Sequence, residues 1–433
     1  MAEEKKTSMY DYVNAGFVAL GMAMGEKVGL FDVLIKLSED GSWKTTEEIA
    51  AAAKLKERYV REWCKAMGCA DVIEMDESGV RFRIGAQRAV ELRMAVPFAT
   101  FVPLLSQVFG DIESCFQPSG PNGVSYDKYT DFHKLMNGLT VAAFEPMVLP
   151  CLFIQMPDLE EKLSSGIICL DVGCGLAEPS RNLAKKFPNS QFYAIDFSAS
   201  SIAQAKELAS KDNLNNVHFF AMDATQLDKD WTNKFDWVTA VDAIHDQAHP
   251  RKVLKEIVRV LKPGARFSMI DVKGTSNAYE DKKTLGSGNS AGHYMASLFH
   301  CMPVSLYFDG GEGLGTMWGA AVANELLAEA GLLDAKTFDT DHPVIMAIAV
   351  PPNSPTDAAE YFGANDIKEG DGELSTLFAK PGITITYTVD GRKLHDGIPL
   401  ASESPDQLWK GLLTRKAICQ LRSMATADEN SCK

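Results

Sequence analysis

The stretch LDVGCGLAEPSRNLAKKF, residues 170–187, decides how this chain folds. It starts as the end of an apolar strand, passes two glycines, Gly173 and Gly175, and continues with the spacing of a helix from about Glu178. Glycines let a backbone turn sharply and approach a ligand closely, and the NH groups at the start of a helix point to the same place. A lone G-x-G is not specific, so its meaning depends on the segments around it.

Further apolar segments alternate with helical stretches beyond this turn. They are SQFYAIDF (190–197), NVHFFAMD (216–223), FDWVTAVD (235–242) and, after the breaker Lys262–Gly264, ARFSMIDV (265–272). Such alternation predicts an α/β fold with a parallel sheet covered by helices on both faces. The segments at 334–341 and 343–351 predict a hairpin that closes the sheet.

Counted from the strand before Gly173, the first four predicted strands each end in an aspartate: Asp171, Asp196, Asp223 and Asp242. Ligands of open α/β sheets bind outside the carboxyl ends of the strands, so these side chains describe one nucleoside pocket. Asp196 is placed to accept both hydroxyls of a ribose, and Asp223 to accept from an adenine amino group.

As a set, LDVGCGLA, AIDFS, MDAT, FDWVTAVDAIHD and LKPGARF resemble the successive motifs of class I S-adenosylmethionine-dependent methyltransferases, over about residues 165–352. The usual G-x-G-x-G of that family reads Gly173, Gly175, Ala177 here. The resemblance implies a Rossmann-like seven-stranded core, S-adenosyl-L-methionine as cofactor and a small-molecule acceptor. It also implies a cofactor site made by Asp171, Gly173, Cys174, Gly175, Asp196, Phe197, Asp223, Ala224, Val241 and Asp242, with Tyr126 as a lid.

The N-terminal region predicts a winged helix-turn-helix. Thr45 and Glu48 fit a capping box, the helix KERYVREWCKAM (56–67) follows, and DVIEMDESGVRFRIG (71–85) alternates as a hairpin around residues 76–79. DAIHDQAHP (242–250) and the stretch 298–319 are similar to a subgroup of methyltransferases that carries such a domain, including actinobacterial and animal proteins. We expect a scaffold or homodimerisation role, because acidic residues are mixed with the basic ones on the second helix and the wing.

The segment AVDAIHDQAHP (240–250) places two histidines four residues apart, the spacing of a helical zinc motif. Pro250 disfavours helical geometry at His249, and no ligand set of clear spacing completes a site, so we expect no metal. His245 and Asp246 would lie beside the transferring methyl as catalytic residues, where a base could deprotonate a hydroxyl, amine or thiol acceptor. A thioether acceptor would need no base.

Candidate substrate contacts lie in two further segments. In AGHYMASLFHCMP (291–303), His293 and His300 share a helical face with Ser297, and Tyr294 lies beside them. Tyr129 and Trp318 complete the candidates. The glycine-rich run 308–319 lacks the lysine of a phosphate-binding loop, so a loop over the substrate and a tight structural turn are both open.

Composition narrows the class of protein. The net charge of −15 argues against coating nucleic acid, and nine scattered cysteines without a CxxC pair indicate a reduced, cytoplasmic protein. No stretch predicts a signal peptide or a membrane span.

We expect four regions: a winged-helix domain (1–90), a helical connector and lid (91–160), the methyltransferase domain (161–352) and a small α+β extension (353–433) made of a linker, a hairpin around Asp390 and a helix. A cofactor-sensing transcription regulator and a protein methyltransferase are the alternatives.

Overall fold

The computed structural model describes residues 8–130, 132–333, 335–340, 345–350, 387–389 and 392–394. Contacts divide the chain into two units, Met1–Ala364 and Asn365–Lys433. In the second unit, β11 (Tyr387–Val389) pairs with β12 (Arg392–Leu394) in antiparallel register, which confirms the expected hairpin. The expected linker and C-terminal helix of that extension lie outside the described residues.

The N-terminal domain has the predicted order of helices and strands. It contains α1 (Met9–Lys27), α2 (Leu30–Leu37), β1 (Lys44–Thr45), α3 (Thr46–Ala53), α4 (Glu57–Cys69), β2 (Glu74–Met75) and β3 (Arg81–Arg83). Thr45 and Glu48 form the capping box at the start of α3. Helix α4 buries Val60, Trp63 and Met67. Strand β3 pairs with both β1 and β2, so the hairpin is the wing.

Helices occupy most of the next region, as predicted. They are α5 (Ala86–Ala99), α6 (Phe101–Ser106), α7 (Phe109–Cys115), η1 (Tyr126–Lys128), α8 (Phe132–Ala143), η2 (Phe144–Val148), α9 (Leu149–Gln155) and α10 (Leu159–Ser165). Among the described residues no single helix is long and apolar enough to cross a membrane. One bent pair, Ala86–Arg93 with Ala95–Ser106, reaches the required length and composition.

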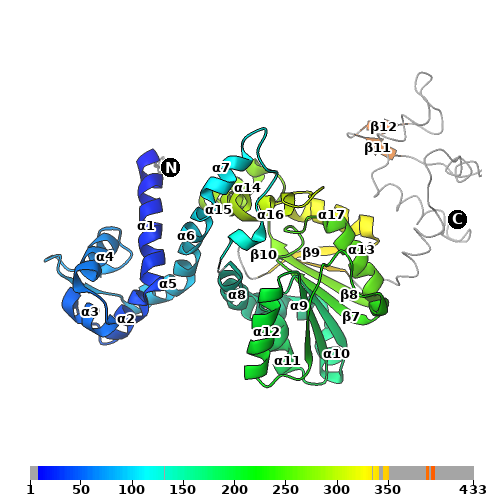
Figure 1. Cartoon of the computed structure of the whole chain (residues 1–433), viewed down its shortest axis with the longest axis horizontal. Coiled ribbons are helices and arrows are strands. Elements are labelled where there is room, and N and C mark those ends of the chain that lie inside the picture. Colours follow the sequence, from blue (N-terminus) through cyan, green and yellow to red (C-terminus); the bar gives the residue numbers. More distant parts are fainter. Residues whose placement is uncertain are drawn as a thin grey trace, which may run out of the picture. The chain divides into compact units, whose positions relative to one another are not determined.

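A seven-stranded sheet forms the centre of the methyltransferase region (Figure 1), in the order β6-β5-β4-β7-β8-β10-β9. The strands are β4 (Ile168–Val172), β5 (Gln191–Asp196), β6 (Val217–Ala221), β7 (Phe235–Val241), β8 (Leu261–Val272), β9 (Lys336–Asp339) and β10 (Ile345–Val350). The first five are parallel, whereas β10 pairs antiparallel with β8 and β9. The predicted Rossmann-like sheet and its closing hairpin are therefore confirmed.

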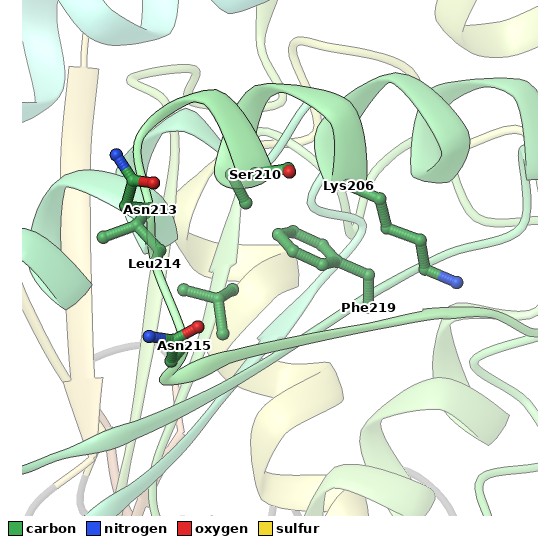
Figure 2. Close-up of a pocket in the computed structure, with 8 residues that line it drawn as sticks. Lys206, Ser210, Asn213, Leu214, Asn215 and Phe219 are labelled. Carbon is green, nitrogen blue, oxygen red and sulfur yellow. The ribbon is translucent and has the colours of Figure 1, made fainter.

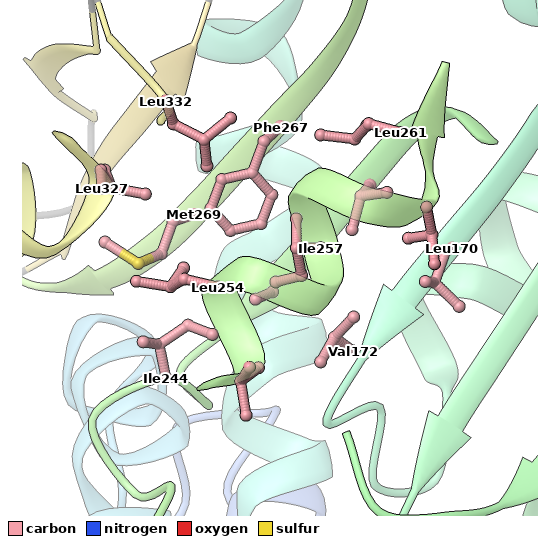
Figure 3. Close-up of a cluster of buried hydrophobic side chains, with 14 of the residues drawn as sticks. Leu170, Val172, Ile244, Leu254, Ile257, Leu261, Phe267, Met269, Leu327 and Leu332 are labelled. Atoms are coloured by element: carbon pink, nitrogen blue, oxygen red, sulfur yellow. The ribbon is translucent and has the colours of Figure 1, made fainter. Parts of the chain in front are cut away.

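Helices cover both faces of this sheet, because successive strand residues point to opposite sides. Leu170 and Val172 of β4 pack with α13 (Pro250–Val260) and α17 (Gly319–Ala330) in one core, part of which Figure 3 shows. Cys169 packs on the other side with residues of α9, α10 and α11 (Glu178–Lys186). Helix α12 (Ala199–Lys211) follows β5. The residues of the first core are buried against one another, and this packing holds the strand ends that carry the candidate site.

Strand β8 differs from the prediction at its start. Lys262–Gly264 was expected to break the chain before the strand, but β8 already begins at Leu261. Leu261 pairs with Phe235 and Arg266 with Trp237, so the register shifts across the breaker. Gly264 takes a left-handed φ of 74°, and the ladder bulges around this turn instead of ending.

Candidate active site

The glycine turn after β4 is held by backbone hydrogen bonds. The amides of Gly173 and Cys174 both donate to the Ile195 carbonyl, at 2.9 Å each. Gly173 has a φ of 75°, and a Cβ built on it would lie 2.6 Å from the Cβ of Ala243. The turn after β4 therefore packs directly against the loop after β7, and only glycine fits at residue 173.

Asp171 lies beneath this turn and is 5% exposed. Its Oδ2 accepts a 2.6 Å hydrogen bond from the Ser180 hydroxyl. Burial raises the pKa of Asp171 to about 6, although the Ser180 bond opposes the shift. A buried carboxylate at this edge would favour a positively charged ligand.

Asp196 is oriented by the backbone at the end of β5. Its Oδ2 accepts from the Gly175 amide at 2.9 Å, and its Oδ1 accepts from the Ser198 amide at 2.8 Å. Each oxygen keeps a second lone pair, which suits a pair of adjacent hydroxyls. Phe197 follows with half of its surface exposed, and its ring meets the edge of Tyr126 at 5.1 Å between centroids.

The remaining cofactor candidates lie along the same edge of the sheet. Asp223 is exposed just beyond β6, and its Oδ1 accepts from the Thr225 amide at 2.8 Å. Ala224 is half-buried beside it. Val241 ends β7, and Asp242 follows with a left-handed φ of 52°, a conformation that costs free energy in a residue other than glycine.

His245 lies in the loop between β7 and α13, 2% exposed, among three carboxylates. Its Nδ1 is 3.0 Å from Asp271 of β8 and 3.9 Å from Asp242 Oδ1, while its Nε2 is 3.1 Å from Asp246 Oδ1. Asp271 was not among the predicted site residues. His249 caps α13, which begins at Pro250, so the two histidines do not share a helix, as Pro250 indicated.

These charges shift one another's pKa values. Burial alone lowers the pKa of His245, but Asp271 and Asp246 raise it well above its usual range. Burial raises the pKa of Asp242 to about 7, against the opposing effect of His245. Burial also acts to raise the pKa of Asp246, yet the attraction of His245 prevails and lowers it to about 2. The imidazolium of His245 thus holds Asp246 in its ionised form.

Tyr126 joins these strand ends to the helical connector. Burial raises its pKa well above the ordinary value, with further effects from Asp246, Asp196 and Asp242. Its hydroxyl is 3.5 Å from His133 Nδ1. His133 of α8 also lies 3.7 Å from the position a Cβ would take on Gly175. The predicted lid tyrosine and an unpredicted histidine therefore both lie over the glycine turn.

His300 is fully buried next to this cluster. Its ring stacks on Phe132 with centroids 3.5 Å apart and an angle of 12°, and its Nδ1 is 3.7 Å from Asp246 Oδ2. Neither ring nitrogen has a hydrogen-bond partner among the described residues. Burial lowers the pKa of His300 to about 4, so the ring is neutral at physiological pH.

Of the other predicted substrate contacts, Tyr129 packs edge-to-face against His300 with ring centroids 4.7 Å apart, whereas the hydrogen bonds of His293 and Tyr294 go to other residues. Helix α15 (Ser287–Ala296) changes into the π-helical turn η4 (Ser297–Cys301), which alters the spacing on which the shared helical face rested. His293 turns back and donates from Nδ1 to the Asn289 carbonyl, and Tyr294 donates to Asp281. Tyr129 donates to the Phe299 carbonyl from within a hydrophobic cluster, and Trp318 is buried in the sheet core.

The glycine-rich run after α16 (Met302–Leu306) forms tight turns. Gly310, Gly313 and Gly315 all have left-handed φ values, and a Cβ built on Gly311 would lie 2.1 Å from the Ser305 carbonyl oxygen. The Ser305 hydroxyl accepts from the Gly313 amide at 3.0 Å. This packing favours the structural-turn interpretation of the run.

A pocket elsewhere in the domain is separate from this site. Figure 2 shows it between the end of α12 and the start of β6. It is lined by Lys206, Ala209, Ser210, Asn213, Leu214, Asn215, Val217 and Phe219. It lies at the amino end of β6, whereas the candidate site is at the carboxyl ends of the strands.

The sheet order and the ligand-binding edge define the fold of an S-adenosylmethionine-dependent methyltransferase joined to a winged-helix domain. Two family models agree with this class. The "Methyltransferase domain" model matches residues 163–310, and the "Rv2258c-like winged HTH domain" model matches residues 16–93. The chain therefore contains a methyltransferase domain of this class, preceded by a winged helix-turn-helix domain.

Individual relatives match over shorter stretches. Sterol 24-C-methyltransferase ERG6 of Saccharomyces cerevisiae is 34% identical over 110 residues, 25% of this chain and 28% of that protein. Demethylmenaquinone methyltransferase of Listeria monocytogenes is 32% identical over 111 residues, 25% of this chain and 46% of that protein. In these alignments the chain spans less than half the length of each relative.

Solved structures extend the similarity of fold. A putative O-methyltransferase from Nostoc punctiforme has a TM-score of 0.55 at 15% identity, covering 78% of this chain and 97% of that one. Human N-acetylserotonin methyltransferase in complex with S-adenosylmethionine has a TM-score of 0.55 at 14% identity, covering 81% and 99%. At this identity the match establishes the fold alone.

The residues at the strand ends fit S-adenosylmethionine. Asp196 has one free lone pair on each oxygen for the ribose hydroxyls, because each oxygen accepts a single backbone amide. The buried carboxylate of Asp171 suits a cationic amino group, and the exposed ring of Phe197 offers a surface for adenine.

Proposed function

We propose that this protein transfers a methyl group from S-adenosylmethionine to an oxygen, nitrogen or sulfur atom of a small molecule. One observation carries the proposal: the glycine turn, Asp196 and the loop from Asp242 to Asp246 lie together at one edge of the sheet, next to Tyr126. The cofactor, when bound, supplies an electrophilic methyl group on a sulfonium.

In this proposal the chain mainly positions the reactants, because methyl transfer depends on in-line alignment with the sulfonium. Asp171, Asp196 and Asp223 hold the two ends of the cofactor, and Tyr126 and His133 cover it. His245 and Asp246 face the acceptor. Asp271 holds Nδ1 of His245, which leaves Nε2 as the atom that could exchange a proton with an acceptor.

The direct test is incubation of the purified protein with labelled S-adenosylmethionine and metabolite extracts, followed by mass spectrometry of labelled products. We expect label in a small molecule. Label in protein alone would favour the protein methyltransferase alternative, and no label would contradict the proposal. His245→Ala tests the base: unchanged turnover would show that the acceptor, such as a thioether, needs no deprotonation.

The regulator alternative has less support. On α4, which would read DNA, Arg58 pairs with Glu62 and Arg61 with Glu57 at 3.1 Å, so these cations are already matched by acids. DNA binding needs unmatched cations that displace counterions from phosphates. We expect no shift of genomic fragments in a gel at physiological salt, and tight binding there would reverse our preference.

We further propose that the protein is a homodimer in the cytoplasm. Helix α1 presents an apolar stripe at spacings of three and four residues, made by Met9, Val13, Phe17, Leu20 and Met24, all exposed. An exposed stripe of this kind indicates a protein interface, and the simplest partner to cover it is a second copy of this chain.

A further inference from the structure

The charges around His245 do not balance among the described residues. Asp242, Asp246 and Asp271 surround this one imidazole, and none of the recorded ion pairs brings a lysine or arginine to any of them. With Asp246 and Asp271 ionised and His245 protonated, these three groups already carry a net negative charge, and Asp242, whose pKa is raised to about 7, adds to it as it ionises. Buried charge of this kind is costly unless a further cation compensates it.

The two sides of His245 differ in chemistry. On the Nδ1 side, Asp271 accepts the ring proton at 3.0 Å. On the Nε2 side, Asp246 Oδ1 lies 3.1 Å away, and the ligand atoms of His245, Asp246 and Cys301 all lie within 4.8 Å of one another. The second side thus gathers one nitrogen, one oxygen and one sulfur ligand from two separate segments of the chain.

We propose that His245 Nε2, Asp246 and Cys301 Sγ bind a zinc ion. A tetrahedral zinc site with bonds of about 2.0–2.3 Å places its ligand atoms about 3.3–3.8 Å apart. Here Nε2 and Asp246 Oδ1 are 3.1 Å apart, and all three ligand atoms lie within 4.8 Å of one another. A thiolate together with an imidazole selects zinc over magnesium or calcium. This inference goes beyond the proposed function: a metal on Nε2 replaces proton exchange at that atom, so the metal and not His245 would activate the acceptor.

The surroundings of the three ligands support the assignment. Metal-binding histidines commonly donate their second ring NH to a carboxylate, and Asp271 is such a partner for His245. Thr316 donates to Cys301 Sγ at 2.9 Å, as hydrogen-bond donors around metal-bound thiolates do. Asp246 Oδ1 is buried without a hydrogen bond of good geometry among the described residues, and its charged neighbour at 3.1 Å is His245 Nε2, itself a proposed ligand.

The site is accessible to solvent from one side. The side chain of Asp246 is 20% exposed, whereas His245 and Cys301 are buried, so access is on the Asp246 side. His300, whose ring nitrogens have no partner, lies beside the other oxygen of Asp246. Three protein ligands with one open position is the arrangement of catalytic zinc sites, and the open position would take an acceptor hydroxyl or thiol.

Metal binding by the purified full-length protein tests the inference without an activity assay. We expect about one zinc per chain after gel filtration. Cobalt substitution should produce a near-ultraviolet charge-transfer band from thiolate to metal. Cys301→Ser should abolish the band, and Asp246→Asn should weaken cobalt binding at least tenfold. The matched control is Cys64→Ser, a fully buried thiol in the winged-helix domain, which should leave the band unchanged.

No charge-transfer band in the wild type, or a band that survives Cys301→Ser, would overturn the proposal. If the serine variant does not fold, X-ray absorption on the zinc-loaded wild type decides: one sulfur near 2.3 Å with nitrogen or oxygen near 2.0–2.1 Å supports the site, and a shell without sulfur overturns it. Calorimetry with S-adenosylmethionine on the same samples separates the two proposals, since cofactor binding without zinc defeats only this one.

Discussion

Replacing Asp171 by asparagine should increase the stability of the protein relative to the wild type, and this gain should grow as the pH rises. The same replacement should weaken cofactor binding. Asp171 is nearly fully buried, and burial raises its pKa to about 6. The unfolded chain, with an aspartate pKa near 3.9, loses this proton first. Stability therefore falls as the pH rises from about 4 to 6 and stays low above that. The full cost is about 3 kcal/mol, of which about 1.4 kcal/mol develops between pH 5 and pH 8.

Asparagine keeps an oxygen that can accept from Ser180 but carries no charge. The free energy of unfolding of Asp171→Asn minus that of the wild type should therefore increase by about 1.4 kcal/mol from pH 5 to pH 8. Urea unfolding at several pH values measures it. Asp236→Asn is the control, because Lys262 and the Ile168 amide already stabilise that carboxylate at the opposite edge of the sheet. In Asp236→Asn we expect a loss of stability, because the substitution removes a charge that Lys262 pairs with.

Calorimetry with S-adenosylmethionine completes the test. Loss of one charge-assisted hydrogen bond of about 1.5–3 kcal/mol should weaken binding by about 10-fold to 150-fold in Asp171→Asn. A stability difference that does not grow with pH would refute the burial argument. A difference that grows while affinity stays unchanged would show that Asp171 does not contact the cofactor.

Three further outcomes follow from the same structure. Asp196→Ala removes both proposed ribose contacts and should raise the Kd for S-adenosylmethionine at least 100-fold by calorimetry, whereas Asp236→Asn should not. Gly173→Ala forces a Cβ to 2.6 Å from Ala243 at a left-handed φ, so thermal unfolding should show a loss of about 1–3 kcal/mol, and an unchanged Tm would contradict that packing. Phe17→Asp on α1 should yield monomers in sedimentation velocity, with Glu26→Asp as the control; a dimer that persists would place the interface elsewhere.

Much of the fold was predictable because its signals are local. Alternating strands and helices, the capping box at Thr45 and the turn around Gly173 each depend on a few adjacent residues. Strand ends were predictable too, because parallel strands bring their carboxyl ends to one edge. The same logic applies to Asp271 near the end of β8, which was overlooked although it occupies the equivalent position.

Other site residues leave no local signal. His133 reaches the glycine turn only because α8 packs over the sheet edge, and Cys301 reaches Asp246 only because η4 adds a π turn after α15. A π turn takes more residues than an α turn, so the α-helical spacing used to pair His293 with His300 does not hold across η4. Contacts between distant segments depend on tertiary packing, which residue patterns do not encode directly.

The candidate site is built at the expense of stability. Asp242 takes a left-handed backbone conformation, and Asp171 and Asp242 both carry pKa values raised by burial, so both oppose folding near neutral pH. Cationic ligands reverse this effect, because they favour the ionised carboxylates that the fold alone disfavours.

S-adenosylmethionine, with its sulfonium and amino group, should therefore stabilise the protein more at pH 8 than at pH 5. S-adenosylhomocysteine lacks the sulfonium charge, so the stabilisation that it provides should depend less on pH. Equal shifts in Tm for the two ligands at both pH values would show that buried carboxylates do not discriminate the reactive cofactor from its product.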